Sequence, residues 1–323
     1  MHRLSHRVLG LLLVFSVPLV LSGCAWVAPK DGPVTAAPLA REVEAVDAAL
    51  EYILTQQGDD GSFGGSVGIT LDAIFAGTAA NRDVSGWRTA EGNPNPIEYL
   101  EANWEGHIVN AANTGKLVVG LVAAGHDPRD FAGQDFVEHI LSFDKEGTGS
   151  LGTSALDQAW GMLGVAAAGT PVTQEMVAVL IGFQQSDGGW EFAPDSGADS
   201  NTTALALQAL VAAGVGGDDT SITRGLDFLA TQQSPTGGFA YSTAFGTEAD
   251  ANSTAYCLQA LIATGANPAS EEWRKDGNGP LDALLDFQLS SGAFEWQPGE
   301  GENLLATAQA VPALLGEPLS DIK

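Results

Sequence analysis

Nine aromatic, acidic and amide residues recur ahead of three apolar segments, and their types suit ligand binding. Aromatic rings can stack on a flat ligand or pack against an apolar one. Carboxylates grouped beneath such rings suit a cation, including calcium, which prefers oxygen ligands. A second interpretation stays open, in which the rings cover helix ends and one polar residue per segment caps a helix. The candidate ligand-binding residues are Phe192, Tyr241, Trp296, Asp199, Asp250, Glu302, Asn201, Asn252 and Asn303.

Other side chains that could do chemistry are few and scattered. Once the N-terminal signal described below is removed, the histidines are His107, His126 and His139, all far in sequence from Cys257. This spacing does not indicate a metal site. The sequence also contains no nucleophile elbow and no Ser/His/Asp arrangement. We therefore predict no catalytic residue, and calcium is the one cofactor that the acidic residues favour.

One stretch of sequence occurs twice, 51 residues apart, and a third time in part. Asn-Thr-Thr-Ala from Asn201 recurs as Asn-Ser-Thr-Ala from Asn252, and each copy continues into Leu-Gln-Ala-Leu. A looser copy starts at Asn303. Self-similarity at such a period is typical of a repeat architecture.

A second block precedes each of these stretches. The residues before it form an amphipathic pattern, with Ile222, Leu226 and Leu229 on one helical face. The block itself reads Gln-Gln, a short polar turn, then glycine and an aromatic residue, which ends the helix because glycine readily takes positive φ. Its copies occupy residues 56–63, 184–190, 232–239 and, in degraded form, 288–294.

The segment at residues 204–213 is apolar nearly all round apart from Gln208, so it must be buried on every side. One amphipathic helix followed by one buried helix is what a double-layered ring requires. Six glycines that close the buried helices give six pairs, about twelve helices, and six pairs close a ring. We predict an all-α (α/α)6 toroid over residues 42–317, followed by a tail at 318–323. The closing glycines are Gly77, Gly125, Gly169, Gly214, Gly265 and Gly316.

The N-terminus has the pattern of a secretory signal. Two arginines precede an apolar run at residues 8–20, which predicts a signal peptide at residues 1–23. Leu-Ser-Gly-Cys, ending at Cys24, is similar to the lipobox of bacterial lipoproteins, and this resemblance implies a lipidated Cys24. Residues 24–41 then form a flexible linker. We expect a lipid-anchored protein on the extracytoplasmic face of a cell membrane. The alternative is an ordinary signal peptide with an incidental cysteine.

The chain is strongly acidic, with 13 Lys and Arg against 40 Asp and Glu and a formal net charge of −27. Loss of Arg3 and Arg7 with the signal peptide makes the charge −29. Such a surface repels nucleic acid and anionic headgroups. The expected partners are the membrane, through the lipid on Cys24, and an unknown apolar or cationic ligand or surface protein. With Cys24 lipidated no internal disulfide can form, and Cys257 is expected to be a small core residue.

Residues 224–239 join an amphipathic helix to Gln-Gln-Ser-Pro-Thr-Gly-Gly-Phe, and the copy at 184–190 ends in tryptophan. These residues resemble the QW motif of squalene and terpenoid cyclases. The Thr-Ala-x-x-Leu-Gln-Ala-Leu stretches look like the inner helices of the same superfamily. That superfamily also contains protein prenyltransferase β subunits, cobalamin carriers and complement thioester domains. The resemblance covers nearly the whole mature chain and implies an (α/α)6 toroid, a ring that hosts unrelated activities.

The chemistry of these relatives is missing from the sequence. Triterpene cyclases protonate an alkene with Asp-x-Asp-Asp, and the acidic pairs at residues 59–60 and 218–219 do not complete that motif. Both pairs lie in glycine-rich turns, where solvated turn residues are expected. The Asp, Cys and His zinc site of the prenyltransferases and the Cys-Gly-Glu-Gln thioester motif are not recognisable either.

We therefore expect a non-catalytic module that binds a ligand or a partner. The alternative is a cyclase- or prenyltransferase-like enzyme acting on an isoprenoid or lipid in the central cavity. That alternative requires a deep apolar cavity with a buried carboxyl of raised pKa. A purely structural module of a surface assembly is a third hypothesis, and it requires an exposed apolar patch.

Overall fold

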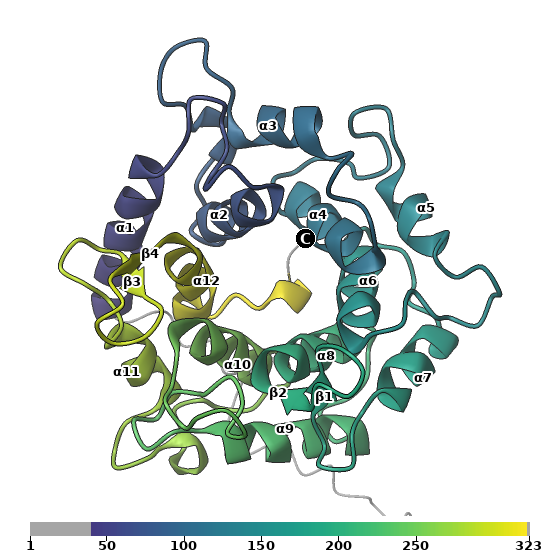
Figure 1. Ribbon diagram of the computed structural model, residues 1–323, viewed down its shortest axis with the longest axis vertical. Coiled ribbons are helices and arrows are strands. Elements are labelled where there is room, and N and C mark those ends of the chain that lie inside the picture. Colours follow the sequence, from purple (N-terminus) through teal and green to yellow (C-terminus); the bar gives the residue numbers. More distant parts are fainter. Residues whose placement is uncertain (1–39, 322–323) are drawn as a thin grey trace, which may run out of the picture. The chain divides into compact units, whose positions relative to one another are not determined.

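The computed structural model describes residues 40–321, and these residues form twelve α-helices in two concentric layers (Figure 1). Odd-numbered helices lie outside and even-numbered helices inside, so the chain alternates between layers. The outer helices are α1 (Ala40–Thr55), α3 (Pro96–Asn103), α5 (Phe136–Leu141), α7 (Gln174–Gly182), α9 (Thr220–Gln232) and α11 (Pro280–Leu285). The inner helices are α2 (Val67–Ala79), α4 (Ala111–Ala123), α6 (Ala155–Ala167), α8 (Ser200–Ala212), α10 (Ala251–Ala263) and α12 (Leu304–Leu315). Three 3-10 helices are η1 (Val84–Gly86), η2 (Glu271–Trp273) and η3 (Leu319–Asp321).

Burial follows the two helix types that the sequence predicted. In α9, Ile222 and Leu229 are fully buried while Asp227 on the other face is exposed. In α8, every residue from Thr202 to Leu210 is buried. An inner helix touches an outer helix and two inner neighbours, so it has no side on which a polar stripe would be favourable.

The ring is closed. Each inner helix packs against the next inner helix, and α12 packs against both α2 and α1. The first and last repeats are therefore neighbours, as Figure 1 shows. The predicted (α/α)6 toroid is confirmed.

A glutamine side chain joins three of the repeats to the outer segment that follows. In each case the side-chain amide also donates to a glycine carbonyl in its own loop. The last of these bonds reaches α1 and so links the end of the ring to its beginning. The bonds to the following segment run from Gln184 to the Ser221 carbonyl (2.9 Å), from Gln233 to that of Trp273 (2.8 Å) and from Gln288 to that of Ala45 (2.8 Å).

A fully buried aromatic residue closes each of these three loops and the equivalent loop before α2. Its backbone N–H donates to a threonine hydroxyl in the first turn of the inner helix. The two repeated sequence blocks recur together because they are bonded to each other. The pairs are Phe63 with Thr70 (2.9 Å), Trp190 with Thr203 (2.9 Å), Phe239 with Thr254 (2.9 Å) and Phe294 with Thr307 (2.8 Å).

Two short antiparallel hairpins precede inner helices. Strand β1 (Trp190–Glu191) pairs with β2 (Ala198–Asp199), and β3 (Phe294–Glu295) pairs with β4 (Glu302–Asn303). The register places Trp190 opposite Asp199 and Phe294 opposite Asn303. Each buried aromatic residue therefore lies beside the residue that starts the next helix.

Five of the six predicted closing glycines do end an inner helix. Gly125, Gly169, Gly214, Gly265 and Gly316 have φ values between 69° and 84°, the left-handed region that favours glycine. The prediction for Gly77 was wrong. Gly77 lies inside α2, where a Cβ would come within 2.5 Å of the Trp87 ring. The left-handed residue after α2 is Asn81, with φ of 55°.

The domain extends beyond both predicted ends. Helix α1 begins at Ala40, inside the predicted linker, and Arg41 in its first turn binds Asp282 of α11 at 2.8 Å. Leu319 belongs to the predicted tail, but it is buried inside the ring. Its N–H donates to Gln208 Oε1 at 2.8 Å. Leu319 is therefore part of the core, where its backbone N–H is a partner for a polar side chain of an inner helix.

The predicted signal peptide, Cys24 and the predicted linker up to residue 39 lie outside the described residues. Within residues 40–321, no helix is both long enough and apolar enough to cross a membrane. Cys257 is a free, fully buried residue of α10, and burial raises the pKa of its thiol.

Replacement of the ring-closing glutamine should destabilise the fold. Gln288→Leu removes the bonds that its amide donates to the carbonyls of Ala45 and Gly292, so we expect the free energy of unfolding to fall by about 2 kcal/mol in urea denaturation. Gln56→Leu is the matched control, since the Gln56 amide donates to an exposed Thr55 hydroxyl. Its expected change is within about 0.5 kcal/mol. Equal losses in both variants would contradict the role assigned to Gln288.

Candidate functional site

The six inner helices start at the same end of the ring, because every repeat runs from an outer to an inner helix. Three predicted site residues are the N-caps of α8, α10 and α12. The side chains of Asp199, Asp250 and Asn303 accept a hydrogen bond from the N–H three residues later, at 2.8, 2.8 and 2.9 Å. Such caps satisfy otherwise unpaired amides at the helix start.

The loop aromatics also have a structural role, through their backbones. The carbonyl of Tyr241 accepts from Ser200 N (2.8 Å), and that of Trp296 accepts from Ala251 N (3.0 Å). Each loop thus caps the inner helix of the preceding repeat. The side chains remain exposed, with 52% of the Phe192 surface accessible to solvent. Helix capping therefore uses their carbonyls and leaves the rings available for contact.

A pocket of about 340 Å³ opens at this end of the ring, between the starts of α6 and α8 and the side of α10. Its volume falls in the range of small-molecule sites. Aromatic rings form much of its wall, and its polar groups come from the first turn of α8. The lining residues are Leu156, Trp160, Phe192, Asp199, Asn201, Thr202, Leu205, Tyr241 and Tyr256.

The pocket brings together four of the nine predicted residues. These are Phe192, Tyr241, Asp199 and Asn201. The other five, which do not line it, are Trp296, Asp250, Glu302, Asn252 and Asn303. Sequence reasoning missed the other five lining residues, Leu156, Trp160, Thr202, Leu205 and Tyr256. A signal for two of them was present: Trp160 and Tyr256 are large aromatic residues in inner helices made mostly of small and aliphatic ones.

Asp199 is the charged residue of the pocket, and only 2% of its surface is exposed. Its Oδ1 caps α8, whereas its buried Oδ2 makes no hydrogen bond. Burial raises the pKa of Asp199. The Tyr241 and Thr202 hydroxyls lie beside this carboxylate and act against that rise. Burial, followed by the Asp199 charge, raises the pKa of Tyr241 to about 12, so the phenol stays neutral at physiological pH.

Known proteins share this architecture. Residues 156–264 match the model of the prenyltransferase alpha-alpha toroid domain. A type II terpene cyclase from Scytonema superposes with a TM-score of 0.55 at 17% identity, over 85% of this chain and 96% of that chain. Residues 156–264 are therefore similar to a prenyltransferase toroid domain, and the described part of the chain shares the α/α toroid fold of the cyclase.

Other toroids are similar to a comparable degree. A glycosidase solved in complex with glucose has a TM-score of 0.53 at 13% identity, over 86% of this chain and 98% of that chain. The ent-copalyl diphosphate synthase from Streptomyces platensis has a TM-score of 0.51 at 17% identity, over 77% of this chain and 50% of that chain. None of the curated proteins matches the sequence. At these identities the likeness shows the fold of the toroid and not its activity.

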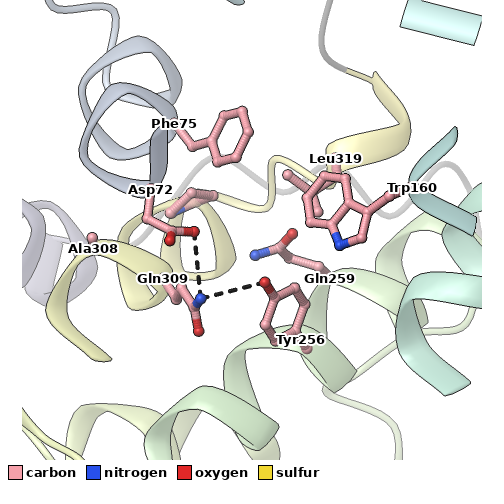
Figure 2. A pocket seen from close by; sticks show the side chains of 9 residues that line it. Asp72, Phe75, Trp160, Tyr256, Gln259, Ala308, Gln309 and Leu319 are labelled. Carbon is pink, nitrogen blue, oxygen red and sulfur yellow. Dashed lines mark hydrogen bonds between the residues drawn. The ribbon is translucent and has the colours of Figure 1, made fainter. Parts of the chain in front are cut away.

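The centre of the toroid contains a polar network (Figure 2). It surrounds a small cavity that lies next to the 340 Å³ pocket, and Trp160 and Tyr256 line both. Gln309 Nε2 donates to Asp72 Oδ1 (3.4 Å) and to the Tyr256 hydroxyl (3.3 Å). Gln309 Oε1 accepts from Asn252 Nδ2 at 2.6 Å. Asn252, a predicted ligand residue, is thus part of the interior of the ring.

The network ends in a buried ion pair. Lys116 Nζ lies 2.6 Å from Asp72 Oδ2, and the two side chains are only 17% and 4% exposed. The same ammonium lies 5.9 Å from the centre of the Trp160 ring. The one carboxylate beside the central cavity is therefore already paired with a cation and a glutamine amide.

The C-terminal segment fills the middle of the toroid. In Figure 1 it runs from α12 into the ring, and η3 packs against α6, α8 and α10. Leu319, Pro312 and Phe75 line a small cavity there, of about 10 Å³. That volume holds no more than a single water molecule.

A second hollow, of about 280 Å³, lies on the outer layer beside α5. Its main polar groups have structural partners. Asp135 caps α5 by accepting from Glu138 N at 2.8 Å, and His139 Nε2 lies 3.2 Å from the Ile108 carbonyl. Across residues 40–321, no three His, Cys, Asp or Glu side chains are grouped as metal ligands would be.

The buried ion pair should make a large contribution when one partner is removed. Lys116→Met leaves Asp72 charged and buried, so we expect the free energy of unfolding to fall by about 3 kcal/mol. The double variant Asp72→Leu/Lys116→Met should recover much of that loss. Arg82→Ala is the control, because its 2.9 Å pair with Asp47 is more than half exposed and should be worth less than about 1 kcal/mol. Urea denaturation measures all three; a double variant no more stable than Lys116→Met would contradict the assignment.

Proposed function

We propose that this protein is a non-catalytic binding module. The toroid presents the 340 Å³ pocket to a ligand, and a lipid on Cys24 holds the domain at the extracytoplasmic face of a cell membrane. The observation that carries the proposal is the filled centre of the ring. Sites that enclose a drug-sized ligand have volumes of about 300–1,000 Å³, and the cavity beside Leu319 has about 10 Å³.

The buried acids of the interior support the same conclusion. A general acid that protonates an alkene must carry a proton and face a water-free hollow. Asp72 is bound to Lys116, and Asp199 and Asp250 cap helices. Each of these carboxylates therefore has a partner or a structural role that proton donation would disrupt.

The competing function is a cyclase-like enzyme acting on an isoprenoid or lipid. Its support is the similarity of the fold to type II terpene cyclases and two buried carboxylates. Asp72 lies beside the small central cavity, and Asp199, whose pKa is raised by burial, lines the 340 Å³ pocket. It requires the C-terminal segment to leave the ring, because Leu319 occupies the space that a substrate would need. The experiment below separates the two functions.

Ligand binding should depend on the ring of Phe192. We would screen the purified domain by thermal shift against isoprenoid alcohols, corrinoids, glycans and peptides, with and without calcium. A ligand at one hundred times its Kd adds about 2.7 kcal/mol of stability, a readily measured shift. Phe192→Ala should weaken that ligand about tenfold. Phe245→Ala is the control, because Phe245 is 77% exposed and does not line the pocket.

Two outcomes would overturn the proposal. One is that no compound of the panel stabilises the domain. The other is that a geranylgeranyl substrate is converted to a cyclised product by the wild-type domain, detected by mass spectrometry, and that this conversion stops in Asp72→Asn.

Anchoring should depend on Cys24 alone. Cells that make the full chain should incorporate a labelled fatty acid into it, and the protein should sediment with membranes, since two or more acyl chains anchor stably. Cys24→Ser should lose the label and move to the soluble fraction. Cys257→Ser is the control and should keep both label and membrane association, because Cys257 is fully buried. A label that survives in Cys24→Ser would contradict the lipid anchor.

A further inference from the structure

The chemistry of the pocket wall selects among ligand classes. Four aromatic rings line it, from two inner helices and two loops: Trp160 of α6, Tyr256 of α10, Phe192 and Tyr241. The faces of such rings attract cations, and more strongly when water is excluded. The lining contains one carboxylate, Asp199, and no lysine or arginine.

Asp199 lacks a partner that its structural counterpart has. Asp250 caps the next inner helix in the same way, and its second oxygen accepts from the Ser253 hydroxyl at 2.7 Å. The residue that matches Ser253 is Thr202. The Thr202 and Tyr241 hydroxyls both lie beside the Asp199 carboxylate, but Asp199 Oδ2 is buried and accepts no hydrogen bond from either. A buried carboxylate oxygen without a donor is unfavourable unless a ligand supplies one.

No lysine or arginine side chain supplies a positive charge to Asp199. Lys116 reaches the Trp160 ring, but its ammonium is bound to Asp72 at 2.6 Å. An anionic ligand would meet Asp199 and a chain of formal charge −27. A metal ion would need more ligands than one carboxylate. Residues 40–321 contain no group of three His, Cys, Asp or Glu side chains that could hold one. A sugar could stack on the rings, but it would leave the negative charge uncompensated.

We propose that the pocket binds an organic cation, with its alkylammonium group among the four aromatic rings and its charge opposite Asp199. This inference rests on the proposed binding function and names the class of its ligand. The aromatic rings contact the alkyl groups, and the free Asp199 Oδ2 faces the positive end. Asp199 is therefore a ligand residue as well as a helix cap, whereas Asp250 is a helix cap alone.

The test compares choline with its neutral isostere 3,3-dimethyl-1-butanol by isothermal titration calorimetry on the wild-type domain. Choline should bind at least about tenfold more tightly, because the two molecules differ only in the charged atom. Asp199→Asn should remove most of this preference, and it should keep the melting temperature because asparagine caps helices as well as aspartate does. Asp250→Asn, which makes the same change in the matching cap, should bind choline like the wild type.

Phe192→Ala provides a second variant if Asp199→Asn fails to fold, and it should weaken choline binding about tenfold. The wild-type domain could bind choline and the isostere with equal affinity, and Phe192→Ala could lose the binding of both. That result would overturn the cation inference and leave the binding function intact. The absence of choline binding to the wild-type domain would overturn the inference as well. Loss of the preference in Asp250→Asn but not in Asp199→Asn would place the charge elsewhere and also overturn it.

Discussion

The side-chain amide of a glutamine holds consecutive repeats together, and the rest of the ring depends on this contact. At three junctions the glutamine bonds to its own loop and to the next outer segment, so it ties each of these repeats to the one that follows. The glycine of the same loop must approach that segment closely. A Cβ on Gly188 would come within 2.3 Å of the Arg224 carbonyl, and one on Gly292 equally close to that of Ala48. Glutamine, glycine, buried aromatic residue and threonine therefore recur as a set because they form one junction.

Where the set is degraded, other polar groups make the junction. In the repeat before α6, the side chain of Gln158 accepts from Leu151 N at 2.9 Å, in place of threonine and an aromatic residue. The carboxylate of Asp144 accepts from two N–H groups of the loop that follows it. The ring tolerates such changes because Gln288 still bonds to α1 and closes it. The match to the toroid family model, at residues 156–264, covers the repeats in which the motifs are most regular.

The sequence was sufficient to predict the ring, because helix type, buried aromatic residues and caps are local properties that repeat. It was not sufficient for the contents of the ring. Leu319 lies in a short segment without periodicity, and only its contact with Gln208 reveals that it fills the centre. Gly77 was misassigned because glycine serves both helix ends and close packing, and the sequence does not distinguish them. Trp160 and Tyr256 were missed because they lie on different inner helices. The rotation of each helix about its own axis brings their side chains to one pocket, and the sequence does not give that rotation.

The geometry of the repeats explains why only four of the nine predicted residues share one pocket. A repeat places equivalent residues at equal angles around the ring, so Phe192, Tyr241 and Trp296 cannot all face one hollow. The structural duties of the repeat are carried by atoms that every copy has, such as the capping carbonyls of Tyr241 and Trp296. Residues that differ between copies are free of that constraint. Asp199 lines the pocket whereas Asp250 does not, and its buried Oδ2 lies where two inner-helix aromatics and two loop aromatics meet.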